Sequence, residues 1–390
     1  MNVHLNGGRD SGDIILIDRH VFASNASVFD TAWRTFGWTP GIAGERSGRL
    51  EEAVPWATLA ARAERPAHLR GAADEVLEPG NFDRLEFAFL PLDGRFGFSV
   101  WGAIGRAGAA PEWRVLTHTL LFDRATFDLI AGFPFALLSD AKLGRWFREM
   151  VEHSPFEQPE TLAPVAVPVA PDTRARFERA RLREITRLRD RLLSLSGDAA
   201  ALEQRLAQLY EALAITQAGG PVKRVALRAR NGIDQALLVR LAWLSLPIAD
   251  RAEIFFTTEQ RKTQSPAATL LVLPESEWGQ FVPEATRLLE RTASAEEREV
   301  SAGRYHWARA VARNARVLAA LSARVDTRAW RLIARDDVAR LDALQRWRER
   351  TVRAGLTQSA VQELIGIECS LAASTARVRW RALGHTVGVA

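Results

Sequence analysis

The 390-residue chain has one cysteine, three lysines and no long apolar run. Because Cys369 stands alone, intramolecular disulfides are impossible and a zinc site built from several thiolates is excluded for the monomer. No segment approaches the roughly 18 uncharged apolar residues of a membrane-spanning helix, and the start of the chain lacks the basic and apolar parts of a signal peptide. We therefore expect a cytoplasmic protein without a membrane partner.

Recognisable catalytic motifs are missing as well. The sequence has no Gly-Lys-Ser/Thr, which excludes nucleotide hydrolysis by a P-loop, and no Gly-x-Ser-x-Gly nucleophile turn. Its seven histidines form neither an HxH nor an HExxH pair, the spacings that place two imidazoles on one metal ion. The sequence therefore predicts no bound cofactor and no metal.

Two single side chains still deserve a chemical hypothesis. His118 lies in an apolar strand with Asp123 close behind, so a hydrolase that uses this pair is one possibility to test. The alternate positions beside His118 are apolar, which favours a hydrogen-bonded histidine of the core. Cys369 falls in an amphipathic helical pattern over residues 361–373, which is typical of a buried free thiol.

What the chain does have is arginine. Basic residues number 52 against 47 acidic ones, a net charge of +5 that is small for this length. Six arginines between Arg174 and Arg187 are interleaved with glutamates, which favours a solvated charged face over a nucleic-acid track. Residues 295–350 carry 13 arginines and 8 acidic residues, so nucleic-acid binding through the Arg-rich helices between Arg304 and Arg350 is a second hypothesis.

The front of the chain alternates short apolar runs with turn residues, which predicts strands. We expect a buried strand over residues 13–18 and a hairpin of residues 84–92 and 95–101 around an Asp-Gly turn. A further strand over residues 113–122 has apolar residues on both alternating sets, which places it inside a sheet. Asp123 is then the expected N-cap of a helix.

The pattern as a whole predicts an α+β protein with a strand-rich front and a helix-dominated back interrupted by a small α/β insert. Five prolines between Ser154 and Asp172 predict an extended linker. The expected parts are a strand-rich α+β domain (1–153), this Pro-rich linker (154–172), a helical hairpin plus small α/β unit (173–282) and a helical domain (283–390).

Twelve tryptophans are unusual, and several lie beside arginine in helical patterns. Core packing is the ordinary explanation for tryptophans in helical patterns, among them Trp243. The alternative is a protein-binding face, because tryptophan and arginine are enriched among binding hot spots. The candidate partner-binding residues are Trp330, Arg331, Arg346, Trp347 and Arg348.

Two stretches resemble the bacterial GTPase-associated protein family. Phe87 to Asp123, with PLDGR in a hairpin and LTHTLLFD in the following strand, is similar to that family's N-terminal domain. Ile233 to Thr258, an apolar helix with a Leu-Pro stop and a final FFTT, is similar to its middle domain. The resemblance implies a non-enzymatic adaptor of a bacterial defence system that acts with a GTPase or another NTPase. Nucleic-acid binding and an unrecognised hydrolase are the alternatives.

Overall fold

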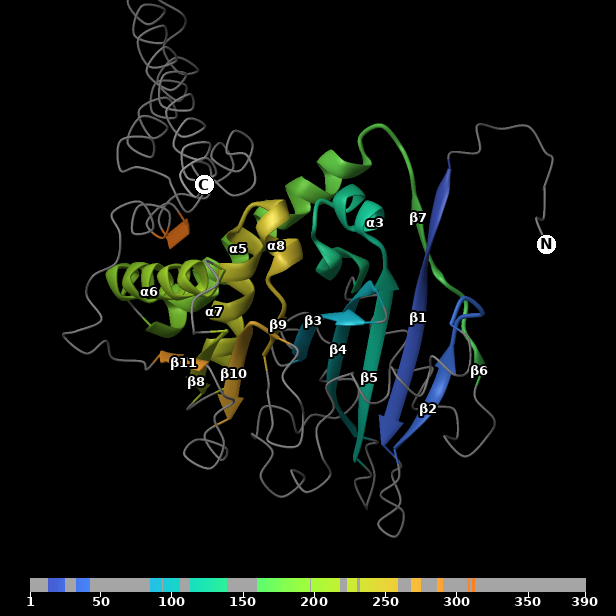
Figure 1. Cartoon of the computed structure of the whole chain (residues 1–390), viewed down its shortest axis with the longest axis horizontal. Helices are drawn as coiled ribbons and strands as arrows, with labels where there is room; N and C mark the ends of the chain where they lie inside the picture. The colour runs from blue at the N-terminus through green and yellow to red at the C-terminus, as the bar shows by residue number, and fades with distance from the viewer. Residues whose placement is uncertain are drawn as a thin grey trace, which may run out of the picture. The chain divides into compact units, whose positions relative to one another are not determined.

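The computed structural model of the chain forms an α+β structure (Figure 1). It divides into two compact units, Met1–Ala180 and Arg181–Ala390. The residues that it describes are 13–24, 33–42, 85–92, 94–105, 113–138, 160–196, 198–217, 223–229, 232–258, 268–274, 286–289, 308, 311 and 312.

The first unit is built on one mixed sheet with the strand order β3-β4-β5-β1-β2-β6. Neighbours are antiparallel except β2 and β6, and β7 pairs with the first part of β1. Figure 1 shows β4, β5 and β1 side by side. The elements are β1 (Ile14–Ser24), β2 (Trp33–Trp38), β3 (Glu86–Leu92), β4 (Arg95–Gly105), β5 (Trp113–Phe122), α3 (Arg124–Leu129), the 3-10 helix η4 (Pro134–Leu138), β6 (Glu160–Thr161) and β7 (Val165–Pro168).

The predicted hairpin and interior strand are confirmed. β3 and β4 pair so that Phe89 lies opposite Phe98, and Gly94 in the turn has φ +73°, which favours glycine. Asp93, the other predicted turn residue, lies outside the described residues. β5 lies between β4 and β1, as expected for a strand with apolar residues on both faces.

Phenylalanine forms the core of this unit. Phe98 of β4 meets Phe135 of η4 edge to face with 4.7 Å between ring centroids, a preferred arrangement for aromatic pairs. Phe89 of β3 stacks on Phe127 of α3 at 5.4 Å. All four rings are buried. The two short helices after β5 are therefore anchored to the sheet by their aromatic side chains.

The Pro-rich segment is less independent than the prediction of a linker implied. Val165–Pro168 forms β7 and pairs with β1, with Val165 opposite Ile17. Glu160–Thr161 forms β6 and pairs with β2. Val165 and Val167 are buried, because alternate side chains of an extended backbone lie on one face of the sheet. Proline is tolerated in such a strand at the edge of a sheet. Part of the segment thus belongs to the sheet of the first unit.

The second unit contains a parallel sheet with the order β11-β8-β10-β9. The helix α5 begins in the first unit and continues into the second. The elements are α5 (Thr173–Ser196), α6 (Ala199–Gln217), β8 (Arg224–Ala229), α7 (Gly232–Ser245), α8 (Ile248–Glu253), β9 (Phe256–Thr257), β10 (Leu270–Pro274) and β11 (Thr286–Leu289).

The predicted α/β insert is present, and burial explains its composition. Leu270 to Leu273 of β10 are all buried, because a parallel sheet is covered on both faces and its strands are apolar throughout. α7 is buried all along Gln235 to Ser245, which matches its lack of a polar face. The prediction of helix from Pro283 onward is wrong at Thr286–Leu289, which pairs with β8 as a strand. A short strand such as TRLL is too brief to show a period.

The aromatic core gives a first test of the fold. Phe98→Ala should lower the free energy of unfolding by about 3–5 kcal/mol, because it removes a fully buried ring and leaves a cavity against Phe135. Urea unfolding followed by circular dichroism measures the change. Leu195→Ala is the control, since Leu195 is 49% exposed and should change stability by less than about 0.5 kcal/mol. Equal effects of the two substitutions would contradict this packing.

Candidate functional site

The five predicted partner-binding residues, Trp330, Arg331, Arg346, Trp347 and Arg348, lie outside the described residues. The same holds for Cys369 and for the arginines from Arg304 to Arg350. Trp243 is described and confirms the core-packing interpretation. Its side chain is fully buried, and its Nε1 donates to the carbonyl of Ile254 at 2.8 Å.

His118 is a histidine of the core. Its side chain is fully buried in β5, and its Nε2 accepts a hydrogen bond from Nε of Arg19 at 3.2 Å. An arginine can only donate, so Nε2 carries the lone pair and the ring is neutral with its proton on Nδ1. Asp123, the proposed second member of the hydrolase pair, caps α3 by accepting from the backbone N–H of Thr126 at 2.8 Å. The predicted N-cap is thereby confirmed, and both side chains are engaged in holding the fold.

Burial shifts the titration of both described histidines. Loss of hydration lowers the pKa of His20 to about 4. The same cause, followed by the charge of Arg19, holds the pKa of His118 well below its ordinary value. His20 is also positioned by Thr35, whose hydroxyl lies 3.1 Å from its Nε2. The two imidazoles therefore stay neutral at pH values where exposed histidines are charged.

This difference predicts a loss of stability in mild acid. Unfolded histidines bind protons below pH 6.5 while the folded rings do not, so stability is full above pH 6.5 and falls as the pH decreases. Between pH 7.5 and 5 the His20 ring should cost about 2 kcal/mol, and His118 should add to that loss. Urea unfolding at both pH values measures this, and His20→Gln should reduce the drop. An identical drop in the variant would show that His20 does not contribute to it.

The described residues contain no group of three or more His, Cys, Asp or Glu side chains that could hold a metal ion. Within the same residues, no helix is both long enough and apolar enough to cross a bilayer.

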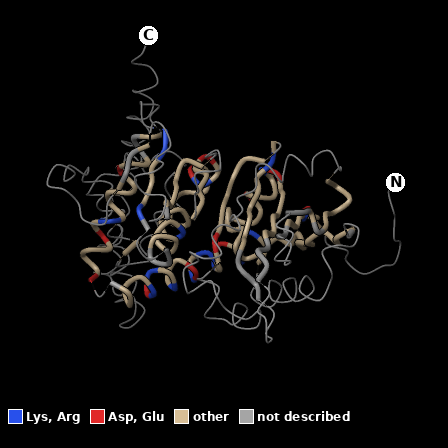
Figure 2. Tube along the Cα trace, turned by 90° about the horizontal axis from the view of Figure 1, so that it is seen from below, with Lys and Arg blue, Asp and Glu red and all other residues tan. Residues whose placement is uncertain are grey.

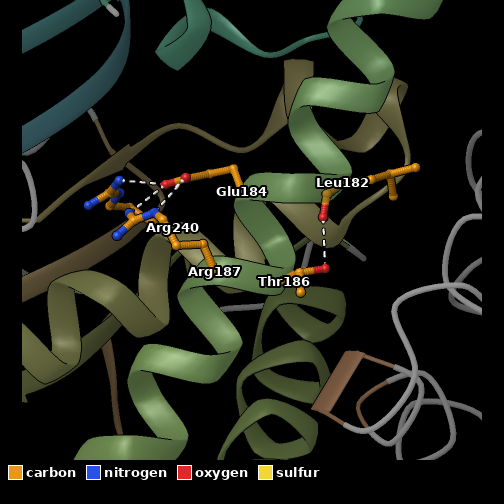
Figure 3. A network of polar contacts seen from close by, with 5 residues as sticks. All are labelled: Leu182, Glu184, Thr186, Arg187 and Arg240. Atoms are coloured by element: carbon orange, nitrogen blue, oxygen red, sulfur yellow. Dashed lines mark hydrogen bonds and ion pairs between the residues drawn. The ribbon is translucent and has the colours of Figure 1, made fainter. Parts of the chain in front are cut away.

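A charged network joins α5 to α7 in the second unit (Figure 3). The carboxylate of Glu184 accepts from Nε and Nη2 of Arg187, both at 2.8 Å, and from Nη2 of Arg240 at 2.9 Å. Figure 3 shows the two guanidinium groups meeting at this one carboxylate. Arg240 is only 1% exposed. One turn earlier on α5, the buried Arg181 donates to the carbonyl of Leu244 at the end of α7.

Removing this carboxylate should be costly. Glu184→Gln takes away the negative charge that faces the buried Arg240 guanidinium, and disruption of a buried pair costs about 3–5 kcal/mol. Chemical denaturation measures the loss. Asp190→Asn serves as a matched control on the same helix, because Asp190 is 60% exposed in its pair with Arg189 and such pairs contribute about 0–1 kcal/mol. A loss as small for Glu184 as for Asp190 would contradict the structural role of the network.

An apolar patch lies on the surface of the first unit. Ile14 and Leu16 of β1 are 60% and 63% exposed, and their partners on β7, Pro168 and Ala166, are exposed as well. Residues directly opposite in an antiparallel pair point to the same face. We call these four residues the apolar stripe.

The apolar stripe corrects the prediction of a buried strand over residues 13–18. Ile17 is buried as predicted, whereas Ile14 and Leu16 are not. The sequence signal was present, since an apolar strand with apolar residues at consecutive positions needs cover on both faces. The sequence alone did not show that one of the two faces of this strand stays exposed in the described structure.

No protein-family model matches the chain, and no curated protein sequence matches it either. The two stretches from which the sequence resemblance was argued are regular strands and helices of the described structure. Phe87 to Asp123 includes β4 and β5 with most of β3, and Ile233 to Thr258 includes most of α7, then α8 and β9. Many of their described side chains are buried in the cores of the two units.

Proposed function

We propose that the chain is a non-enzymatic adaptor, an interaction subunit of a bacterial defence system that acts with an associated GTPase or another NTPase. The resemblance at Phe87 to Asp123 and at Ile233 to Thr258 supplies the class of partner. The observation that supports docking is the apolar stripe. A cytoplasmic location fits this proposal, because a single free cysteine suits a reducing compartment.

The apolar stripe has the properties of a docking surface. Large contiguous exposed apolar side chains mark interaction sites on proteins, and here they come from two strands joined by a regular backbone ladder, from Ile14 opposite Pro168 to Ile17 opposite Val165. The buried side chains of Ile17, Val165 and Val167 hold the inner face of this ribbon. The outer face is thus held in place by the buried inner face, so little conformational entropy is lost when a partner covers it.

The partner in this proposal is an associated GTPase or other NTPase, which would contact the stripe through an apolar area of its own. Covering an exposed Ile or Leu contributes up to roughly 1.5–3 kcal/mol, and 1.4 kcal/mol is a tenfold change in affinity. The double variant Ile14→Ser/Leu16→Ser should therefore recover the NTPase at least tenfold less efficiently. Co-expression and pull-down with GDP, GTP and no nucleotide measure this.

Leu195→Ser is the matched control, because Leu195 is also a large exposed apolar residue but lies on α5. It should pull down the NTPase like the unaltered chain. If the unaltered chain recovers no NTPase under any nucleotide condition, the adaptor proposal loses its basis. If the double variant recovers as much as the control, the adaptor docks through another surface and the assignment to the apolar stripe is wrong.

A further inference from the structure

Helix α5 is the most basic element of the described chain. Between Thr173 and Ser196 it has eight arginines and three acidic residues. Basic and acidic residues are interspersed along the described trace (Figure 2), so net charge alone does not locate a surface. A charged surface is located by the position of its residues on the helix and by their exposure. Five exposed arginines follow one another at spacings of three and four residues: Arg176, Arg179, Arg183, Arg187 and Arg191.

These five residues form one line, which we call the arginine stripe. At 3.6 residues per turn they fall within an arc of roughly 120°, and they extend over roughly 22 Å of helix at 1.5 Å per residue. The opposite side of α5 is buried, with Ile185, Leu188 and Leu192 inside the protein. Arg181 and Glu184 tie the helix to α7. The stripe therefore lies on one continuous helix, rather than on a loop, and the part of that helix from Arg181 onward is anchored to α7.

The charge of the stripe is poorly neutralised by its neighbours. Within the described part of the chain, four of its members are in no ion pair: Arg176, Arg179, Arg183 and Arg191. Glu184 is shared between Arg187 and Arg240, so that the three groups together keep a positive charge. Asp190 falls within the arc of the stripe, but it is paired with Arg189, which lies outside that arc.

We infer that the arginine stripe binds the phosphate backbone of a nucleic acid. Guanidinium groups match phosphate oxygens with paired donors, and a straight row of them with a step of roughly 5–6 Å suits a partner whose charges also repeat. An anionic membrane is a poorer fit, because a helix that lies on a membrane inserts an apolar face and that face of α5 is buried. Contacts of this kind give affinity without sequence preference.

The test removes charge from the stripe without touching the Glu184 network. The variant is Arg179→Gln/Arg183→Gln/Arg191→Gln. The matched control, Arg124→Gln/Arg174→Gln/Lys223→Gln, loses the same net charge at exposed positions outside the stripe. Fluorescence anisotropy with a short mixed-sequence DNA duplex and an RNA strand of equal length measures the affinity of the full chain between about 50 and 200 mM salt. The two probes distinguish DNA from RNA as the source of the phosphates.

Binding by the unaltered chain should weaken steeply with salt. The stripe variant should bind at least about tenfold more weakly at low salt and lower the slope of log K against log salt by about 2–3, because each lost phosphate contact removes close to one counterion. The control triple variant should keep the slope. Thermal unfolding must be alike in the two variants, which excludes misfolding as the cause.

Three results would overturn the inference. One is the absence of binding by the unaltered chain at low salt, and another is equal affinity of the stripe variant and its control. The third is preference for another polyanion, seen when polyglutamate or vesicles with anionic lipid bind through the stripe and the nucleic acids do not. Each of these results leaves the docking test on the apolar stripe unaffected, because that surface is formed by β1 and β7.

Discussion

The first unit depends on the hydrogen bonds that one buried arginine, Arg19, makes to its neighbours. Arg19 lies where β1 leaves β7 and joins β5 and β2. Its Nε donates to His118, its Nη1 to the carbonyl of Ala163 at 3.0 Å, and its backbone N–H to the hydroxyl of Thr39. A buried cation is tolerated only with such partners. The same contacts explain why His118 must stay neutral and why the Pro-rich segment is held against the sheet.

The second unit solves a related problem with different partners. Its sheet and α7 are largely apolar, yet Arg240 of α7, Arg181 of α5 and Arg251 of α8 are almost fully buried. Arg181 uses a carbonyl at the end of α7, Arg240 uses Glu184, and the guanidinium of Arg251 lies 6.0 Å from the ring of Trp243. The planar guanidinium group has several donors and can stack on a ring, so it binds these partners better than a lysine ammonium does. The near-absence of lysine in the sequence is consistent with this use of arginine inside the fold.

The sequence predicted the strands and helices better than it predicted which of their side chains are buried. Local signals were sufficient for the β3–β4 hairpin and the cap at Asp123, because turn and capping chemistry depends on a few adjacent residues. The exposure of Ile14 and Leu16 depends on neighbours distant in the chain, so a strand apolar on both sides could only be assigned to the interior. The burial of Arg19, Arg240 and Arg251 was not predicted either, because a charged residue is expected at the surface unless its partner is known.

This last failure changes how the arginine count bears on nucleic acid. Arg181 stands among the exposed arginines of α5. Its spacing from Ile185 and Leu188 places it on the apolar side of the helix, and it is a buried structural donor, but the count of arginines did not separate it from the exposed Arg179 and Arg183. When all the arginines of this segment were counted together with its glutamates, the sequence favoured a solvated face of mixed charge. Once the buried Arg181 is set aside and Glu184 is assigned to Arg240 as well as Arg187, the remaining row is less balanced than the sequence suggested. Binding of a polyanion is decided by such exposed, unshared charges rather than by composition.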